Sequence, residues 1–158
     1  MEHIDIAVIG GGPAGLRAAE VAAGMGRKVT VFEAKPSMGR KFLVAGKGGL
    51  NLTHDGELGA FASNYASGRD FSEIIGDFDN QALRGWCHGL GLETFVASSG
   101  RVYPKALKGA PVLRAWLVRL REMGVNFMPR HLWTAMLPGN VLRFENGSEY
   151  RAEAVIFA

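Results

Sequence analysis

The hydrophobic positions at the start of the chain follow two different periods. Residues 4–9 and 28–33 are short apolar runs rich in β-branched residues, a pattern typical of buried strands. Between them, residues 13–25 form an alanine-rich helical pattern that is closed by Gly24 and Gly26. This order of elements predicts a β-α-β unit, and the crossover of such a unit is right-handed in nearly all sheets.

Helical periodicity returns over residues 80–91. Leu83, Trp86, Cys87 and Leu90 fall at positions i, i+3, i+4 and i+7, which places them on one apolar face. We therefore interpret Cys87 as part of the core rather than as a nucleophile. The chain has one cysteine, so it contains no redox-active dithiol, and disulfide reductases are excluded.

A further helix is predicted before Gly124, where glycine ends the pattern. Its core face consists of Leu113, Trp116, Leu117 and Leu120. Three arginines lie between these positions and are most simply a solvated face, with a partner surface as the alternative: Arg114, Arg119 and Arg121.

Several short strands complete the pattern. Residues 93–104 form two strands around a Ser-Ser-Gly turn, and residues 125–128 return to the parallel sheet. Residues 131–151 alternate around two turn sequences, which predicts a β-meander, and residues 154–158 have the pattern of a strand buried on both faces. The fold class is therefore α/β, a Rossmann-like parallel sheet with a β-meander crossover.

Composition narrows the class of protein. The 158 residues are 47% hydrophobic, enough for a core, and the 22 glycines indicate many tight turns. The net charge of +3 is spread along the chain, so we expect no nucleic-acid partner. No apolar run is long enough to span a membrane, and the single cysteine suits a reducing compartment, so we expect a cytoplasmic protein without a membrane partner.

The turn after the first strand has the chemistry of a dinucleotide site. Gly10 permits the tight turn, Gly12 lets the backbone approach a pyrophosphate, and Gly15 lets the helix pack closely on the strand. The helix that starts at Pro13 and Ala14 presents free N–H groups to phosphate. Glu33 ends the second strand, where a carboxylate accepts hydrogen bonds from a ribose and repels a 2′-phosphate. The alternative, a glycine turn used only for packing, leaves Glu33 unexplained.

The extended fingerprint resembles that of FAD-binding enzymes related to glutathione reductase. The matching positions are Gly10, Gly12, Gly15, Ala19, Gly26, Val29 and Glu33. The resemblance implies that this segment binds the ADP half of FAD, and it also implies a meander crossover opened by His131, Leu132 and Trp133 near the adenine. The Gly-Pro-Ala-Gly ending favours FAD over NAD by resemblance.

The loop GRKFLVAGKGGLNLT, residues 39–53, follows this fingerprint. Arg40 and Lys41 are cations suited to a pyrophosphate, the glycines permit contact with a flat ring, and Asn51 offers a hydrogen bond to a flavin edge. A mobile loop with solvated cations is the alternative. The candidate cofactor-binding residues are Gly10, Gly12, Pro13, Ala14, Gly15, Glu33, Ala34, Arg40, Lys41, Gly46, Gly48, Asn51, Leu52 and Trp133.

Two segments narrow the resemblance further. GRKFLVAGKGGLNLTH and residues 91–117 resemble the bacterial aminoacetone-oxidase-like family of FAD-dependent oxidoreductases. Many relatives have Arg-Cys where this chain has Gly49-Leu50, so no role of that cysteine transfers. The resemblance implies that Arg101 and Tyr103 lie on the substrate side. It also implies a small-molecule substrate, with NAD(P)H or oxygen as the redox partner, and assigns no catalytic residue.

The resembled family continues beyond the strand at residues 154–158. We therefore expect residues 1–158 to be the N-terminal portion of an FAD/NAD(P)-binding domain that lacks the substrate domain and a C-terminal FAD segment. On that expectation the chain alone binds FAD weakly or not at all and is inactive.

Three functions remain open at this stage. They are an FAD-dependent oxidoreductase, an NAD-dependent Rossmann dehydrogenase, and a non-catalytic dinucleotide-binding module. The histidines His3, His54, His88 and His131 show no metal-ligand spacing, and we assign no metal.

Overall fold

The computed structural model describes residues 2–45, 48–57, 59 and 72–158. They form two units: Met1–Val44 with Trp116–Ala158, and Ala45–Ala115. Within the described residues, no helix is long and apolar enough to cross a membrane.

The first unit is built on a six-stranded sheet with the order β6-β2-β1-β9-β8-β7. β1 pairs in parallel with both β2 and β9, and β2 pairs in parallel with β6. β8 is antiparallel to β7 and β9. The strands are β1 (Glu2–Ile9), β2 (Val29–Glu33), β6 (Asn126–Pro129), β7 (Trp133–Leu137), β8 (Val141–Phe144) and β9 (Glu149–Phe157). The expected Rossmann-like fold, with its third parallel strand and its meander, is confirmed.

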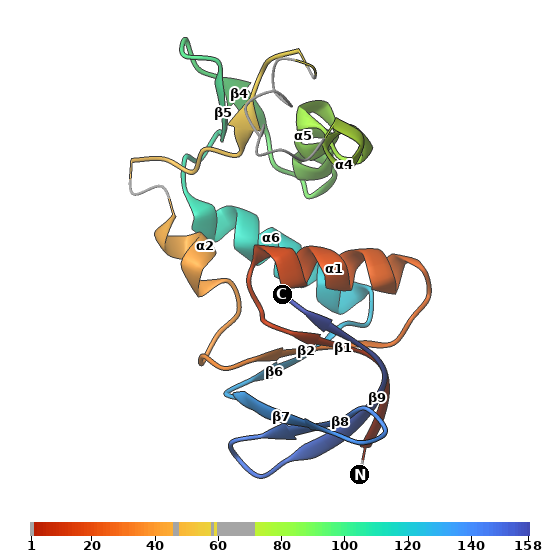
Figure 1. Cartoon of the computed structure of the whole chain (residues 1–158). Helices are drawn as coiled ribbons and strands as arrows, with labels where there is room; N and C mark the ends of the chain where they lie inside the picture. The colour runs from red at the N-terminus through yellow and green to blue at the C-terminus, as the bar shows by residue number, and fades with distance from the viewer. Residues whose placement is uncertain (1, 46–47, 58, 60–71) are drawn as a thin grey trace. The chain divides into compact units, whose positions relative to one another are not determined.

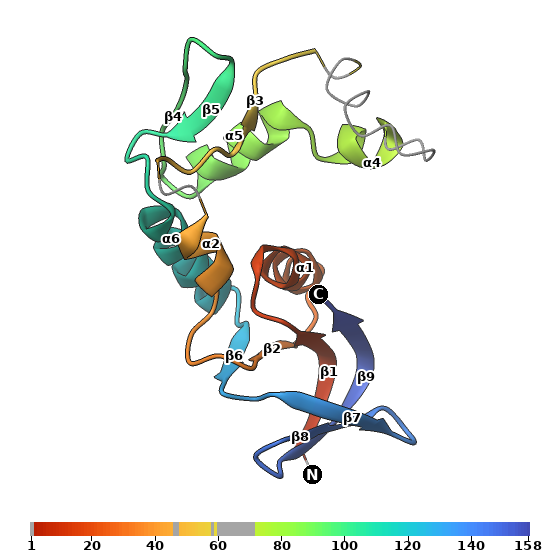
Figure 2. The same cartoon turned by 60° about the vertical axis from the view of Figure 1, so that its left-hand side comes forward.

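Both faces of the parallel strands are covered. α1 (Pro13–Gly24) lies along one side of the strands, and the β7–β8 hairpin lies on the other (Figures 1 and 2). Val29, Val31 and Phe32 of β2 are at most 1% exposed, as expected for a strand that is buried on both faces. Helix α1 ends as predicted, because Gly26 adopts a φ of +78° just after the C-cap.

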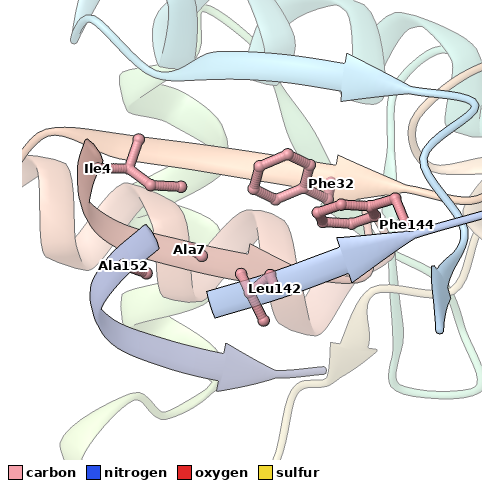
Figure 3. Packing of buried hydrophobic residues seen from close by; sticks show 6 residues of the cluster. All are labelled: Ile4, Ala7, Phe32, Leu142, Phe144 and Ala152. Atoms are coloured by element: carbon pink, nitrogen blue, oxygen red, sulfur yellow. The ribbon is translucent and has the colours of Figure 1, made fainter. Parts of the chain in front are cut away.

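The meander side of the sheet holds a hydrophobic core cluster (Figure 3). Phe32 of β2 stacks on Phe144 of β8, with ring centroids 4.5 Å apart, and Leu142 of β8 is fully buried beside them. Burying each such side chain stabilises the fold by about 1.5–3 kcal/mol. The cluster therefore fixes the meander against the strands that carry the glycine turn; its members are Ile4, Ala7, Phe32, Leu142, Phe144 and Ala152.

β9 differs from expectation in two ways. It is one continuous strand, antiparallel to β8 at Glu149–Arg151 and parallel to β1 along its length, where the sequence suggested a meander and then a separate strand. Its last residues are not buried on both faces, since Phe157 is 53% exposed. The Phe157 ring packs edge-on against Trp133 of β7, so it is covered on that side while the rest of the residue stays exposed.

The second unit contains a small antiparallel sheet with the order β3-β5-β4. The predicted hairpin is present as β4 (Thr94–Val96) and β5 (Arg101–Pro104), with Gly100 at a φ of +76° in its turn. The predicted helix is α5 (Asn80–Gly89), which Asp79 caps by accepting a hydrogen bond from Ala82 N. The sequence pattern did not reveal β3 (Thr53–His54) or α4 (Ser72–Asp77).

Helix α6 (Gly109–Glu122) contributes residues to both units. Its expected core face is confirmed at Leu113, Trp116 and Leu120, which are at most 5% exposed. Arg114 and Arg121 are exposed as expected, whereas Arg119 is solvated only in part: its side chain is 39% exposed, but its Nη1 is buried and lies 3.5 Å from the carboxylate of Glu20 on α1. Glu20 also accepts a hydrogen bond from the Trp116 indole at 3.1 Å, so a buried carboxylate attracts the arginine inward.

Candidate functional site

Two glycines of the turn between β1 and α1 pack tightly against backbone atoms. Gly10 has a φ of +115°, and a Cβ at this position would overlap the carbonyl oxygen of Ala158. A Cβ at Gly15 would overlap the carbonyl oxygen of Gly10 and press on Val8 of β1. Both glycines are therefore required by contacts within the protein, as their assigned tasks in turning and close packing predict.

Gly12 is different, because its missing side chain faces open space. No described atom lies within 4 Å of a Cβ built on Gly12, and its φ of −79° is ordinary. Gly12 is the N-cap of α1, and no side chain caps the helix there. Pro13 and Ala14 in the first turn are exposed. The turn thus presents uncapped N–H groups and the positive end of a helix dipole to open space, which suits an anionic ligand such as a pyrophosphate.

This turn lies at the topological switch point of the sheet. β1 sits between β2 and β9, so the chain leaves it toward one side of the sheet and returns on the other. In open parallel sheets, ligands bind at the carboxyl ends of the strands where the order reverses. Gly10 begins the turn at that end of β1, and Ala158 lies beside it at the end of β9.

Glu33 at the end of β2 is held against the glycine turn. Its Oε2 accepts the N–H of Gly11 at 2.9 Å, and its Oε1 accepts the N–H of Lys35 at 2.8 Å. Each carboxylate oxygen retains capacity for a second hydrogen bond, so the group stays available to a ribose hydroxyl. Sequence reasoning missed the role of Gly11, although the run of three glycines marks a backbone position where a side chain would obstruct this contact.

The segment that begins the basic loop also reaches the turn. Gly39 N donates to the carbonyl oxygen of Gly11 at 2.7 Å, and a Cβ at Gly11 would overlap the sulfur of Met38. Arg40 and Lys41 follow directly and are exposed. They begin α2 (Arg40–Val44), which corrects the interpretation of this segment as a loop throughout. No pattern in the sequence identified Met38, which is 6% exposed.

The remaining loop candidates lie in the second unit, apart from Gly46, which is outside the described residues. Asn51 and Leu52 border the small sheet: Leu52 N donates to Val102 O at 2.9 Å, and the Asn51 amide donates to Thr53 O at 2.9 Å. Gly48 is exposed, with no described atom near an added Cβ. The N–H groups of the Asn51 carboxamide are therefore engaged in the sheet, although the residue itself is exposed.

Arg101 and Tyr103 lie on β5 of the same sheet. Tyr103 is half-buried, stacks on Phe95 with centroids 5.9 Å apart, and covers Gly49, whose added Cβ would lie 3.3 Å from its ring. Arg101 is exposed and pairs in register with His54 of β3. The sheet thus brings Arg101 and Tyr103 onto one strand but gives Tyr103 a structural contact that sequence reasoning did not anticipate.

The meander candidates have mixed surroundings. Trp133 is half-buried, packs edge-on against Phe157 with centroids 4.9 Å apart, and its buried Nε1 finds no partner among the described residues. Ala34 is exposed beyond the end of β2. His131, which the resemblance placed near the adenine, lies next to Glu33: its backbone N–H donates to the Glu33 carbonyl at 2.9 Å, and its ring contacts Phe32.

Cys87 has the surroundings expected of a core residue. Its side chain is fully buried in α5, and burial raises the pKa of its thiol to about 11. The reactive form of cysteine is the thiolate, so this residue is a poor nucleophile. Its interpretation as part of the core is confirmed.

Comparison with known proteins agrees with the Rossmann-like fold described above. The model of a family described as the HI0933-like protein Rossmann domain matches residues 4–158. Among solved structures, THI4 of Thermovibrio ammonificans superposes with a TM-score of 0.59 at 18% identity, over 99% of this chain and 57% of that one.

Two larger structures superpose more closely. An open conformation of a flavocytochrome c3 fumarate reductase has a TM-score of 0.73 at 18% identity, over 99% of this chain and 33% of that one. The 3-ketosteroid-Δ4-(5α)-dehydrogenase of Rhodococcus jostii RHA1 has a TM-score of 0.68 at 18% identity, over 99% of this chain and 45% of that one. At these identities the likeness shows a shared fold, and the chain spans 33–57% of the length of the three structures.

Proposed function

Because this chain belongs to the HI0933-like protein Rossmann domain family, we propose that it is the dinucleotide-binding part of an FAD-dependent oxidoreductase. FAD is the cofactor that the family assignment supports. Within the family we favour the aminoacetone-oxidase-like branch, on the segments GRKFLVAGKGGLNLTH and 91–117. The proposed reaction is oxidation or reduction of a small organic molecule in the cytoplasm, with NAD(P)H or oxygen as redox partner.

One observation carries the proposal: an open, uncapped helix N-terminus at the switch point of the sheet. Gly10 and Gly15 are packed against protein, whereas the space beside Gly12 is empty of described atoms. The φ of Gly12 is ordinary and no described atom contacts an added Cβ, so neither backbone conformation nor packing requires a glycine at this position. A pyrophosphate accepts the N–H groups of such a turn and gains from the helix dipole.

The residues have the following proposed tasks. The backbone of Gly12, Pro13 and Ala14 binds the pyrophosphate, and Glu33 accepts hydrogen bonds from the adenosine ribose while its charge disfavours a 2′-phosphate. Arg40 and Lys41 supply positive charge next to the turn. When bound, FAD supplies the redox chemistry, and the protein binds and orients it.

The other candidates extend the proposal along the cofactor and toward the substrate. We assign Ala34 and Trp133 to the adenosine half, and Gly48, Asn51 and Leu52 to the flavin half. Arg101 and Tyr103 are proposed for the substrate side. What supports them is the family resemblance together with the exposure of Asn51 and Arg101.

The test is a comparison of dinucleotides on two glycine variants. Because the chain alone is expected to bind FAD weakly at best, thermal shift and calorimetry are performed at millimolar concentrations of FAD, ADP, NAD⁺ and NADP⁺ on the wild-type chain, on Gly12→Ser and on Gly24→Ala. Serine at the N-cap of α1 supplies a hydroxyl that caps its N–H groups, so the free energy of unfolding stays within about 0.5 kcal/mol. The hydroxymethyl group fills the space proposed for the pyrophosphate, so affinity for FAD and ADP falls tenfold or more.

Gly24→Ala is the matched control on the same helix. Its new methyl group meets only the Met123 side chain, at 3.8 Å, so ligand affinity stays at the wild-type value. We expect FAD to stabilise the wild-type chain more than NAD⁺, and NADP⁺ least of all. Stabilisation by NAD⁺ above that by FAD would replace the flavoenzyme with a nicotinamide-dependent dehydrogenase, and equal FAD affinity in Gly12→Ser would remove the turn from the site.

A further inference from the structure

The opposite end of β1 carries a second group of polar side chains. His3 and Asp5 lie two residues apart on β1, and Glu153 lies on β9. Because Ile4 pairs with Ala152 and Ile6 with Ala154, the register places Glu153 beside Asp5 on the neighbouring strand. β1 and β9 lie side by side in both views of the molecule (Figures 1 and 2).

The potential ligand atoms of these residues converge. One imidazole nitrogen and one oxygen from each carboxylate all lie within 4.8 Å of one another. His3 and Glu153 are exposed and Asp5 is half-buried, so two of the three side chains are free to turn toward a common centre. The protein ligands of a zinc ion, bonded at 2.0–2.2 Å, lie about 3.4 Å apart, so the observed separations of up to 4.8 Å must shorten by roughly 1.4 Å when an ion binds.

The two carboxylates of the group, Asp5 and Glu153, lie on neighbouring strands with no cationic lysine or arginine of the described residues paired to them. Like charges directly opposite one another on neighbouring strands are destabilising. Within the described part of the chain, neither Asp5 nor Glu153 forms an ion pair with a lysine or arginine. The carboxylate of Asp5 is nevertheless held in place, since its Oδ2 accepts the N–H of Lys28 at 3.2 Å.

We propose that His3, Asp5 and Glu153 form a binding site for a divalent transition-metal ion, Zn²⁺ in the first instance. Imidazole among the ligands favours Zn²⁺ over Mg²⁺ or Ca²⁺, which prefer all-oxygen sites. Three protein ligands leave a fourth position for water. The site is separate from the glycine turn: four residues of β1, Ile6–Ile9, lie between Asp5 and Gly10, so the two Cα atoms are roughly 16 Å apart along the strand.

This assignment differs from the expectation drawn from histidine spacing. None of the four histidines lies near another in the sequence, and the spacing of His3 to Asp5 is too common to signal a metal. The third ligand is supplied by a strand near the other end of the chain. Only the parallel pairing of β1 with β9 brings Glu153 to the other two.

The test uses the 158-residue chain without a polyhistidine tag, titrated with ZnCl₂ and, separately, MgCl₂ in a buffer that does not chelate. Calorimetry should show one Zn²⁺ per chain at this site and no comparable binding of Mg²⁺. His3→Ala and Glu153→Gln should each weaken Zn²⁺ binding by about tenfold or more, because each removes one of three ligands. His88→Ala, another exposed histidine, should leave the affinity unchanged.

Thermal melting provides a second readout that separates binding from folding. Without metal, Glu153→Gln should melt at or slightly above the wild-type temperature, because it removes a like-charge contact. With Zn²⁺, the wild-type chain and His88→Ala should gain the same stability, and His3→Ala and Glu153→Gln should gain less. Unchanged Zn²⁺ affinity in both His3→Ala and Glu153→Gln, or an equal loss in His88→Ala, would overturn the proposal.

Discussion

Two glycine-rich segments of this molecule look alike in sequence and are built differently. The turn from Gly10 to Gly15 in the first unit has two glycines locked against backbone atoms and one, Gly12, facing open space. The segment from Gly48 to Asn51 in the second unit has Gly49 packed under the Tyr103 ring at a φ of +144°, with Gly48 open beside it.

The comparison teaches that glycine content alone does not identify a ligand-binding loop. In the first segment, the open glycine is the N-cap of a twelve-residue helix. The dipole and free N–H groups of that helix attract an anion to the open space. In the second, no helix follows the open glycine within the described residues 49–57, and its neighbour Gly49 packs against the Tyr103 ring. The turn from Gly10 to Gly15 therefore supports cofactor binding more strongly than the segment from Gly48 to Asn51, although the sequence made both of them candidates.

The largest effect on the free energy of unfolding is expected at Gly15, which packs directly against backbone atoms. Gly15→Ala places a methyl group onto the carbonyl oxygen of Gly10, which cannot move without displacing the turn and the end of β1. We expect a loss of about 3 kcal/mol in the free energy of unfolding, measured by urea denaturation. Gly26→Ala, with a positive φ but open surroundings, should lose only about 1 kcal/mol. Equal losses in the two variants would mean that the turn is not closed by packing.

An intermediate effect is expected at Gly49. An added methyl group lies 3.3 Å from the Tyr103 ring, and the backbone is in a region that other residues rarely adopt. Gly49→Ala should therefore cost about 1–2 kcal/mol of unfolding free energy. Tyr103→Leu in the same background should recover part of that cost, because a smaller side chain relieves the contact. A double-mutant cycle measures this coupling, and strict additivity would contradict the packing role assigned to Gly49.

The smallest effect is expected at Gly48, which has no described atom within reach of an added Cβ and no positive φ. Gly48→Ala should leave the free energy of unfolding within about 0.5 kcal/mol of wild type. The same variant sharpens the comparison with Gly12 when FAD affinity is measured by calorimetry. A loss of affinity without a loss of stability would place both open glycines at the cofactor, whereas unchanged affinity would restrict the site to the first unit.

Much of the fold follows from local patterns in the sequence. The apolar runs at residues 4–9 and 28–33, the helices at 13–25 and 80–91, and the hairpin around the Ser-Ser-Gly turn all correspond to observed elements. Each of these depends on side-chain periodicity and turn chemistry within a few residues. Helix α2 was missed because a short stretch between glycines, Arg40–Val44, has too few residues to show a period.

The candidate site was predictable in its chemistry and less so in its contacts. The tasks of Gly10, Gly12 and Gly15 follow from φ and from close approach, which are local requirements. Three contacts join residues that are far apart in the sequence. Glu33 accepts a hydrogen bond from Gly11 N, Met38 packs against Gly11, and Arg119 lies beside the carboxylate of Glu20. Pairwise contacts of this kind depend on how elements pack, and no period in the chain encodes them.

The sequence by itself determined the order of elements, the β-α-β turn with its acidic strand end, and the core role of Cys87. These properties arise from propensity, periodicity and the conformational freedom of glycine, all of which act over a few residues. The tertiary structure alone decided which glycine stays open, that β9 serves both the meander and the parallel sheet, and that Glu153 joins His3 and Asp5. The physical reason is strand pairing: hydrogen bonds between β1 and β9 set the neighbours of residues that lie nearly 150 positions apart.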